Sequence, residues 1–517
     1  MRRIPLHPLL FATFPILFLF VQNAERVRFA KVTGPWLVVL VCTTIVTAVA
    51  GLVFRDLRRG AIVGSGFAIL ALSYGHMWTA IQDKAILGLV VGRDMFLLPL
   101  WGLLAAGIIL FAWRLKSIAE VTAIVNIVAA GLVIVSAVNT SSAIASQSER
   151  AFQANVGKLS EKIRVAKDAG TKRDIYYMIY DRYGSGPVLK EFLNYDNSGF
   201  LDALRERGFY VADGAQSNYP TTAHSVASSL NMKYLDDLAE RMGEGSKDWK
   251  PLYRTIPGSK VSRFLQDQGY SYAHIGSWYD PTASDKTAQV NYHYDKTSEF
   301  TRVLIQTTLM QPLAKRIGLL KEFDGRQVIH NQILFQFDSI IDASKLPGPT
   351  FTFSHILLPH EPFTFTADGG YLTEDEAVSR SWEEGYTGQV KFANRKILAM
   401  LDKLLDVPAD RRPIIIIQAD EGPKRYEWTF GGRKRWEDAT DDQLREKVGI
   451  IDAYYLPDAG GTADAGLYQD ITPVNSFRKV FNFYFGTDLD YLPDRNYVYG
   501  TGEEPYRLTD ITDRVNP

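Results

Sequence analysis

Hydrophobic residues dominate the first 140 positions of the chain, and only short polar gaps interrupt them. Each uninterrupted run approaches the ~20 residues that an α-helix needs to cross a bilayer. No small-residue cleavage site closely follows the first run, so we expect it to be retained rather than removed as a signal peptide. The pattern predicts a five-helix transmembrane bundle over residues 1–140. The five runs are residues 5–22, 36–54, 61–80, 95–113 and 118–138.

Basic residues near the ends of the runs predict the orientation of the bundle. If the N-terminus is cytoplasmic, seven Lys and Arg residues lie in the inner segments and five in the outer gaps. Basic residues are favoured on the cytoplasmic side of a membrane. An odd number of spans then places every residue after 140 outside the cytoplasm.

The hydrophobic pattern changes after residue 140. Apolar positions are sparse over residues 141–172. This is typical of a juxtamembrane linker helix at the surface rather than of a sixth span. Residues 173–517 have the mixed composition of a folded domain. We therefore expect a transmembrane domain (1–140), a linker helix (141–172) and an extracytoplasmic domain (173–517).

Short apolar runs in the third part predict strands, and amphipathic stretches between them predict helices. The strand runs are apolar on both faces, which is typical of a parallel sheet with both faces covered. Alternation of the two patterns predicts an α/β domain with a mostly parallel central sheet. The strand runs are residues 174–184, 349–363, 413–423 and 448–457. The helical stretches are residues 198–208, 259–269 and 388–405.

Polar side chains follow three of the predicted strands. Asp181 ends the first strand run, His360 lies just past the second, and Asp420 and Glu421 end the third. Ligands of such sheets bind at the carboxyl ends of the strands. Carboxylates that meet there repel one another, and a divalent cation relieves the repulsion. The oxygen-rich set suits Mg²⁺, Mn²⁺ or Ca²⁺ better than a metal that prefers thiolates.

Two adjacent threonines, Thr221 and Thr222, stand where a helix is predicted to begin. A helix N-terminus favours anions such as phosphate, because its backbone N–H groups and dipole point there. Coordination to a cation would lower the pKa of a hydroxyl and make it a nucleophile. Alternatively, one threonine simply caps the helix.

Composition excludes several classes of protein. With 57 basic and 58 acidic residues, the net charge is −1, so nothing indicates a nucleic-acid partner. Cys42 is the single cysteine of the chain, and it lies in an apolar run. An intramolecular disulfide, a cysteine metal site and a cysteine nucleophile are therefore not expected.

The sequence blocks around these residues resemble the alkaline phosphatase-like, or sulfatase-like, superfamily. That superfamily shows a strand-end acid, a hydroxyl or thiol nucleophile at a helix start, a later His-x-Pro and a strand ending in Asp-His-Gly. Within it, the chain is similar to lipoteichoic acid synthase and to lipid A phosphoethanolamine transferases, which place five spans before an extracytoplasmic catalytic domain. The resemblance implies a multi-pass protein of a bacterial plasma (inner) membrane, with its C-terminal domain periplasmic or extracellular.

The resemblance assigns roles to four residues of the motifs. "YDRYG" places Asp181 as the first metal ligand, and "TTAHSV" resembles Thr-Ala-x-Ser-Val, which makes Thr222 the nucleophile and a further ligand. In "ADEGP", Asp420 matches a metal ligand, whereas Glu421 stands where the family has histidine. Glutamate still ligates a hard cation and moves the expected preference from zinc toward Mn²⁺, Mg²⁺ or Ca²⁺. Glu421 in place of the family histidine is also compatible with a pseudoenzyme, a protein of this fold without catalytic activity.

The resemblance also indicates residues for the substrate. "SHILLPHEPF" is similar to a histidine pair five residues apart, so His360 is expected to touch the transferred phosphoryl group and His355 to assist. A loop with His274 and Trp278 is a candidate substrate wall or simply a packed aromatic loop. On a helix expected near the site, Lys391 and Asn394 could bind phosphate or form a solvated face.

Together these features imply a metal-dependent membrane phosphotransferase. The expected reaction moves phosphoethanolamine or phosphoglycerol from a phospholipid to an envelope glycan or lipid through a phospho-threonine. A threonine rather than a cysteine at the nucleophile position argues against a formylglycine sulfatase. Two alternatives stay open at this point: a phosphoester hydrolase of the same fold, and a non-catalytic module that binds a glycan or a partner.

Overall fold

The chain forms two compact units in the computed structural model. One unit combines Met1–Ala151 with Thr297–Gly325, and the other combines Phe152–Lys296 with Arg326–Pro517. The domain boundaries expected from the sequence stay predictions. The structure describes residues 4–24, 27, 29–81, 85–86, 89–90, 94–155, 163, 165, 172–294, 298–317, 325–425, 434–458 and 465–516.

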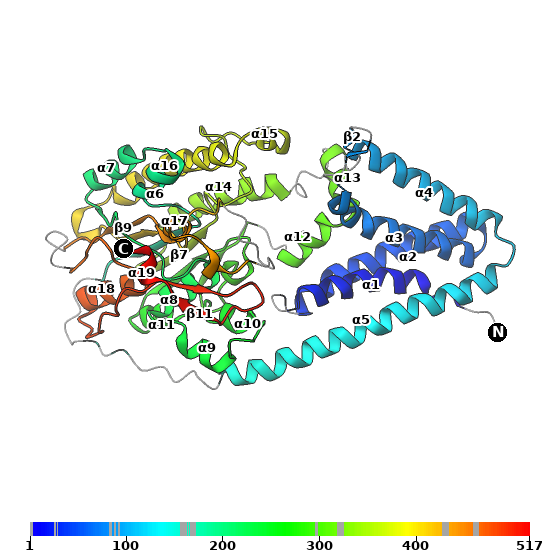
Figure 1. Ribbon diagram of the computed structural model, residues 1–517, viewed down its shortest axis with the longest axis horizontal. Coiled ribbons are helices and arrows are strands. Elements are labelled where there is room, and N and C mark those ends of the chain that lie inside the picture. The colour runs from blue at the N-terminus through cyan, green and yellow to red at the C-terminus, as the bar shows by residue number, and fades with distance from the viewer. Residues whose placement is uncertain are drawn as a thin grey trace. The chain divides into compact units, whose positions relative to one another are not determined.

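The first unit is built from apolar helices (Figure 1). Four stretches are long and apolar enough to cross a membrane: Phe29–Phe54, Leu57–Ile81, Asp94–Arg114 and Ile118–Ala145. The helix over the first apolar run is shorter, at 16 residues, so the predicted count of five spans is confirmed for four. The elements are α1 His7–Gln22, η1 Phe29–Lys31, α2 Thr33–Phe54, α3 Leu57–Ile81, β1 Ala85–Ile86, β2 Leu89–Val90, α4 Asp94–Arg114 and α5 Ile118–Asn155.

The outer faces of these helices are apolar. Leu103 of α4 and Ile127 of α5 are 72% and 73% exposed. Large apolar side chains at this exposure need an apolar solvent, which a bilayer provides. The unit therefore belongs in a membrane.

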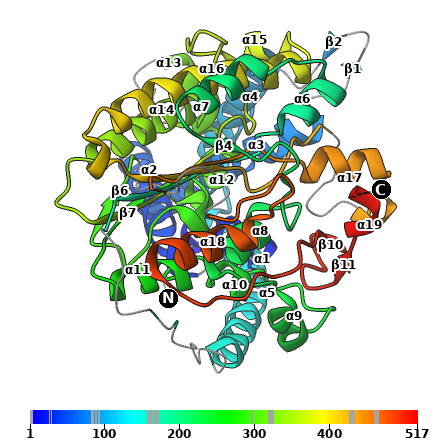
Figure 2. The same cartoon turned by 90° about the vertical axis from the view of Figure 1, so that its left-hand side faces the viewer.

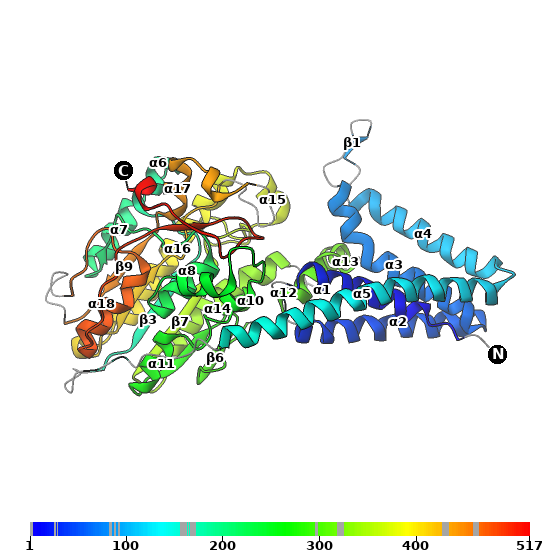
Figure 3. The ribbon, with the colours of Figure 1, turned by 60° about the horizontal axis from the view of Figure 1, so that its bottom comes forward.

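Helix α5 is longer than the apolar run that predicted it. It continues without a break to Asn155, as Figure 3 shows. The sequence predicted a change from span to linker helix near residue 140. No glycine or proline occurs over residues 139–155, so nothing in the chain stops the helix where its apolar character ends. Most of the predicted linker after residue 155 lies outside the described residues.

Two short helices from later in the chain also belong to the first unit: α12 Glu299–Gln306 and α13 Met310–Ile317. Phe300 and Leu304 of α12 are buried, and they pack in one apolar cluster with residues of α1 and α3. The sequence did not predict that a segment of the third part returns to the membrane unit.

Backbone hydrogen bonds fasten this returning segment to α3. Gly75 donates its N–H to the carbonyl of Thr307 at 3.0 Å, and the carbonyl of Ala71 accepts from the N–H of Leu309 at 2.8 Å. A side chain at Gly75 would meet the backbone of Thr307, since an added Cβ would lie 2.5 Å from its Cα. Glycine at this position permits the close approach.

The second unit contains a seven-stranded sheet in the order β4-β9-β8-β3-β7-β5-β6. Its central strands β7, β3 and β8 are buried at every position. The strands are β3 Ile175–Tyr180, β4 Tyr210–Val211, β5 Ser271–Ile275, β6 Val290–Tyr292, β7 Thr350–Ile356, β8 Ile414–Gln418 and β9 Asp452–Tyr455.

Five neighbouring strands, β8, β3, β7, β5 and β6, pair in parallel, which confirms the predicted mostly parallel sheet. β9 runs antiparallel to β8, and β4 antiparallel to β9. The run at residues 448–457 was predicted as a parallel strand, so its direction was wrong. An apolar run indicates that a strand is buried but not in which direction it runs, so the sequence could not distinguish a parallel from an antiparallel strand here.

Helices cover both faces of the sheet (Figures 1 and 2). The predicted helices 198–208, 259–269 and 388–405 correspond to α7, α11 and α16. One face carries α6 Gly186–Leu193, α7 Ser198–Glu206, α14 Gly325–Ala343 and α16 Trp382–Leu405. The other carries α8 Thr222–Asn231, α10 Lys250–Tyr253, α11 Lys260–Asp267 and α18 Pro473–Phe485. The remaining elements are α9 Asp236–Met242, η2 Asp280–Thr282, α15 Glu374–Val378, η4 Ala409–Arg411, η5 Trp436–Asp438, α17 Asp441–Val448, α19 Thr512–Val515 and the hairpin β10 Tyr497–Tyr499 with β11 Leu508–Asp510.

Candidate active site

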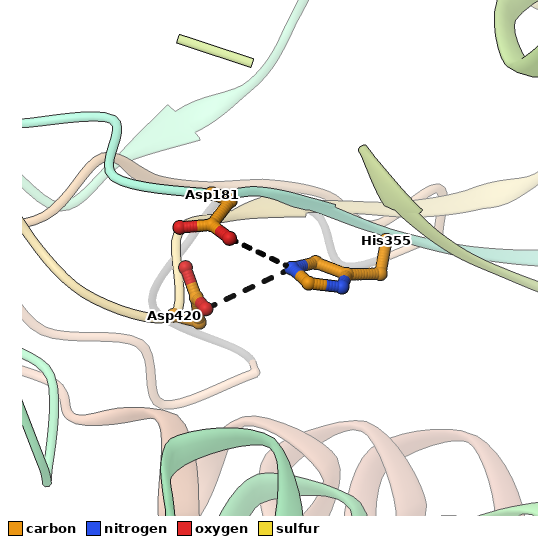
Figure 4. A group of neighbouring side chains, drawn as sticks. All are labelled: Asp181, His355 and Asp420. Atoms are coloured by element: carbon orange, nitrogen blue, oxygen red, sulfur yellow. Dashed lines mark ion pairs between the residues drawn. The ribbon is translucent and has the colours of Figure 1, made fainter. Parts of the chain in front are cut away.

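Three neighbouring parallel strands bring Asp181, His355 and Asp420 together. β3 lies between β7 and β8 in the sheet. Asp181 directly follows β3, His355 is the penultimate residue of β7, and Asp420 comes two residues after β8. Their side chains therefore meet at the carboxyl edge of the sheet, as Figure 4 shows. We call these three residues the Asp–His–Asp group.

The Asp–His–Asp group has the dimensions of a metal site. His355 Nε2 lies 3.4 Å from Asp181 Oδ2 and 3.7 Å from Asp420 Oδ2 (Figure 4). One ligand atom from each residue falls within 4.8 Å of the other two, and all three residues are buried. Such a cluster of carboxylate and imidazole donors is a known arrangement for a divalent ion.

Each member of the group also has a buried polar atom without a hydrogen-bond partner. The three atoms are Asp181 Oδ1, His355 Nε2 and Asp420 Oδ2. Buried polar atoms in folded proteins almost always have a partner, because leaving one without is costly. A cation placed among these residues would supply that partner, so the residues fit a metal.

The pKa values of the group show the repulsion that a cation would relieve. Burial and the nearby Asp181 carboxylate raise the pKa of Asp420 to about 8. Burial also disfavours ionised Asp181, but His360, His355 and Arg182 together hold its pKa well below the usual range. Burial disfavours the charged form of His355, yet its contact with Asp181 raises its pKa. The two carboxylates thus do not ionise together easily, and Asp181 is the one that stays ionised.

The hydroxyl of Thr282 fixes the orientation of the His355 ring. It lies 2.9 Å from His355 Nδ1, which leaves Nε2 facing the two carboxylates. The Thr282 carbonyl lies 2.9 Å from His274 Nε2, and its hydroxyl lies 2.8 Å from Ser277 Oγ. A hydrogen bond at one ring nitrogen sets the tautomer and direction of a metal-binding histidine. Nothing in the sequence pattern distinguished Thr282.

The two adjacent threonines have different environments. Thr221 is the N-cap residue of α8 and is buried, and its hydroxyl lies 2.8 Å from His224 Nδ1. Thr222 is the first residue of α8 and is half-buried. Its side chain lies close enough to Asp420 to lower the pKa of that carboxyl, against the larger effect of burial. Thr222, not Thr221, therefore adjoins the Asp–His–Asp group.

Glu421 was expected as a metal ligand, but the structure places it outside the group. Its Oε1 accepts a hydrogen bond from Arg182 Nε at 3.0 Å, and its Oε2 lies 3.1 Å from Lys447 Nζ. Asp420 and Glu421 lie in the bend after β8, and the two basic side chains hold the Glu421 carboxylate away from the group. His355, expected only to assist with the substrate, lies in the group instead.

The other candidate substrate residues divide between the site and the scaffold. The rings of His360 and Trp278 meet edge to face, with centroids 5.6 Å apart, and His360 influences the pKa of Asp181. His274 lies in β5 rather than in a loop, and both its ring nitrogens have partners in the scaffold.

Neither of the two candidates on α16 reaches the Asp–His–Asp group. Asn394 is hydrogen-bonded to Tyr183 and donates to Asn197 at 2.7 Å, so it supports the segment after β3. Lys391 lies over the ring of Tyr195, 5.4 Å from its centroid, on the exposed side of the helix.

Among solved structures, the fold is similar to phosphoethanolamine transferases. It resembles the lipooligosaccharide phosphoethanolamine transferase A from Neisseria meningitidis, an integral membrane protein, at 13% identity and a TM-score of 0.41, over 92% of this chain and 95% of that chain. It also resembles the C-terminal periplasmic domain of EptC from Escherichia coli, at 11% identity and a TM-score of 0.43, over 68% of this chain and 96% of that chain. A further crystal structure of that domain is a complex with Zn.

The phosphonate monoester hydrolase of Agrobacterium radiobacter is also similar, at 13% identity and a TM-score of 0.38, over 63% of this chain and 80% of that chain. No protein-family model matches the chain, and no curated protein matches it either.

Proposed function

We propose that the protein is a metal-dependent membrane phosphotransferase in which Thr222 is the nucleophile. The observation that carries this proposal is the Asp–His–Asp group, three buried residues with an unpartnered polar atom each, beside a half-buried threonine at a helix start. The helix N-terminus behind Thr222 favours an anionic group at that position.

Asp181, His355 and Asp420 would hold one divalent ion, and Thr222 would complete the set. Because His355 contributes a nitrogen donor in place of the oxygen expected from Glu421, the donor set suits Mn²⁺ or Zn²⁺ better than Mg²⁺ or Ca²⁺. When bound, the ion would supply positive charge that acidifies a hydroxyl and stabilises phosphoryl oxygens.

The proposed chemistry has two displacements at phosphorus. In the first, Thr222 Oγ forms a bond to phosphorus, the bond from phosphorus to the lipid alcohol oxygen breaks, Thr222 loses its proton, and the alcohol gains one. In the second, an acceptor hydroxyl oxygen forms the new bond, the Thr222 oxygen leaves, and the proton of the acceptor replaces the one that Thr222 lost. The phospho-threonine between the two steps makes the transfer a covalent mechanism.

The membrane unit supports a lipid donor. Four helices are long and apolar enough to cross a bilayer, and they are joined covalently to the unit that carries Thr222. Tethering an active site to the surface that holds its substrate raises the effective concentration of that substrate. We propose a phospholipid bearing phosphoethanolamine or phosphoglycerol as donor and an envelope glycan or lipid as acceptor, with the second unit on the periplasmic or extracellular side.

The direct test is a mass measurement of the phospho-threonine. The full-length protein, loaded with Mn²⁺ or Zn²⁺, is incubated with phosphatidylethanolamine or phosphatidylglycerol vesicles, and its intact mass and phosphopeptides are recorded. We expect an adduct on Thr222 that is absent from Thr222→Ala and present in Thr221→Ser, the matched control. A wild-type protein that binds metal but never acquires the adduct would contradict the proposal.

Product analysis distinguishes the acceptor. With a labelled lipid donor, transfer to a glycan or lipid hydroxyl supports a transferase. Release of the free phospho-alcohol in the presence of such acceptors identifies water as the acceptor and the protein as a hydrolase. Absence of both metal and adduct identifies a non-catalytic binding module.

A further inference from the structure

The residue after Asp181 has an unusual backbone and an unusually constrained side chain. Arg182 has a φ of 66°, in the left-handed region that a side chain disfavours by about 1 kcal/mol. Its N–H lies 3.4 Å from Asp420 Oδ1, and its carbonyl accepts a hydrogen bond from Tyr386 at 2.7 Å. Strained residues that the surroundings hold in place concentrate at functional sites.

Two glutamates hold the guanidinium of Arg182. Nε donates to Glu421 at 3.0 Å, and Nη1 donates to Glu361. Glu361 is fixed in turn, because Trp382 Nε1 donates to its other oxygen at 2.7 Å. Lys447 similarly engages the second oxygen of Glu421. The planar guanidinium is therefore set in one orientation before any ligand binds.

One end of this guanidinium has no hydrogen-bond partner in the part of the chain that the structure describes. No hydrogen bond among the described residues involves Arg182 Nη2. The guanidinium adjoins the Asp–His–Asp group, since its Nε lies 3.9 Å from Asp181 Oδ1. His360 is also close, because the positive charge of Arg182 helps burial to lower the pKa of that imidazole. The N–H donors of Nη2, held beside the Asp–His–Asp group, suit an oxyanion.

The charges around Arg182 also favour an anion once a metal is bound. Three acidic side chains, those of Asp181, Glu361 and Glu421, interact with the basic side chains of Arg182, Lys447 and Lys424, and Asp420 adds a fourth carboxylate that is ionised when a metal is bound. The formal balance is one negative charge. A divalent cation would make it one positive charge, which a phosphodiester monoanion neutralises.

We propose that Arg182 binds a non-bridging phosphoryl oxygen of the phosphodiester through Nη2, and that Glu361 and Glu421 are the residues that position its guanidinium. This inference rests on the proposed function and adds to it a residue that recognises the phosphoryl group. It also gives Glu421 a role other than metal ligation. The competing explanation is that the ion pairs of Arg182 only stabilise the turn after β3.

The experiment measures phosphate binding separately from metal binding and from folding. In the Thr222→Ala background, which forms no covalent adduct, the dissociation constant of inorganic phosphate is measured by calorimetry with the full-length, metal-loaded protein. Metal content and melting temperature are recorded for the same samples. The variants are Arg182→Lys, Glu421→Gln and Trp382→Phe. The control is Arg445→Lys, because Arg445 pairs with exposed Asp442 away from the group.

We expect Arg182→Lys to weaken phosphate binding about tenfold or more, because a lysine cannot reproduce the fork that the glutamates hold. Glu421→Gln and Trp382→Phe should weaken it about three- to fivefold, as expected for loss of one positioning hydrogen bond. Metal content should be unchanged in all variants, Glu421→Gln included, and Arg445→Lys should match the parent.

The proposal is overturned if Arg182→Lys binds phosphate like the parent, or if phosphate affinity falls only in variants whose melting temperature falls as well. Loss of metal in Glu421→Gln would also overturn it, since Glu421 would then be a ligand. The outcome is separable from that of the proposed function. If Thr222 acquires the adduct but Arg182→Lys has no effect on phosphate binding, only this inference is contradicted. If phosphate binding depends on Arg182 but no adduct forms, the proposed phosphotransferase is contradicted and the anion site is supported.

Discussion

Two buried polar clusters are built on the same strands, β3 and β8, but their hydrogen bonding differs. Asp181 and Asp420 of the Asp–His–Asp group lie past the ends of these strands, and all three residues of the group keep an unpartnered atom. A second cluster, which we call the sheet network, lies inside the sheet, within a few residues of the first. It comprises Tyr177, Gln418, Asp452, Tyr454 and Ser476.

The sheet network is almost completely satisfied. Gln418 accepts from the Tyr177 hydroxyl at 2.7 Å and donates to Asp452 at 3.0 Å and to Ser476 at 2.9 Å. The Tyr454 hydroxyl lies 2.7 Å from both Asp452 Oδ2 and Ser476 Oγ. Within this network, Asp452 Oδ1 is the one side-chain atom without a partner.

The two clusters show how buried polar side chains that stabilise the fold can be distinguished from buried polar side chains that bind a ligand. Burial alone does not do it, because both clusters are buried and each holds an aspartate whose pKa burial raises to about 8. The fraction of polar atoms that have a hydrogen-bond partner distinguishes the two clusters. A network whose polar atoms are paired with one another stabilises the fold, whereas a network with unpaired atoms needs a ligand.

The same substitution in the two clusters should have the most different outcome. Asp420→Asn replaces a carboxylate oxygen of the proposed metal site by an amide nitrogen, so we expect metal content near zero and a loss of the proposed activity of about a thousandfold, or about 4 kcal/mol. Asp452→Asn should keep both metal and activity. Metal analysis and adduct formation on Thr222 measure the pair. Equal metal content in the two variants would remove the distinction between the clusters.

Gln418→Leu should affect the fold and spare the metal. The leucine cannot form the hydrogen bonds that Gln418 makes with Tyr177, Asp452 and Ser476. We expect this loss to lower the free energy of unfolding by about 2–3 kcal/mol. Thermal unfolding of the full-length protein, followed by tryptophan fluorescence, checks this value. Loss of metal without loss of stability would show that the network belongs to the site.

Thr282→Val should weaken metal binding without removing any ligand. The valine cannot hydrogen-bond His355 Nδ1, so the ring is no longer held with Nε2 toward the carboxylates. We expect the metal affinity to fall about ten- to a hundredfold, measured by competition with a chelator. Ser277→Ala is the control, because Ser277 touches the Thr282 hydroxyl but not the histidine. Unchanged affinity in Thr282→Val would exclude a positioning role.

The most gradual effect should be a pH dependence of stability that arises from the sheet network. Burial raises the pKa of Asp452 to about 8 from its ordinary 3.8, so the folded state retains a proton that the unfolded state releases. Its contribution to stability therefore falls as pH rises from about 4 to about 8, by at most about 1.4 kcal/mol per pH unit. The difference in unfolding free energy between Asp452→Asn and wild type should grow over this interval. A constant difference would mean that Asp452 is ionised throughout.

The sequence predicted the framework of the site because its signals are local. Runs that are apolar on both faces identified β3 and β8, and the acidic residues after them, Asp181 and Asp420, do meet at one edge. Helix α8 begins at Thr222, where the sequence predicted a helix to open. The same rule could have brought His355 into the group, since it stands at the end of the neighbouring strand β7.

What the sequence could not provide depends on geometry across the chain. Pattern and resemblance placed Glu421 among the metal ligands, but its direction is decided by the basic partners Arg182 and Lys447, which come from other segments. The hydrogen bond from Thr282 to His355 spans 73 positions and leaves no periodic trace. The antiparallel direction of β9 is likewise set by pairing, not by composition.

The returning segment α12–α13 has a practical consequence for preparing the second unit alone. A fragment that begins after α5 would still carry Phe300 and Leu304, whose apolar neighbours on α1 and α3 have been cut away. It would also carry the amide of Leu309 and the carbonyl of Thr307 stripped of their partners on α3. Such a fragment is expected to aggregate and to bind detergent. Replacing residues 298–317 by a short flexible linker should give a soluble protein.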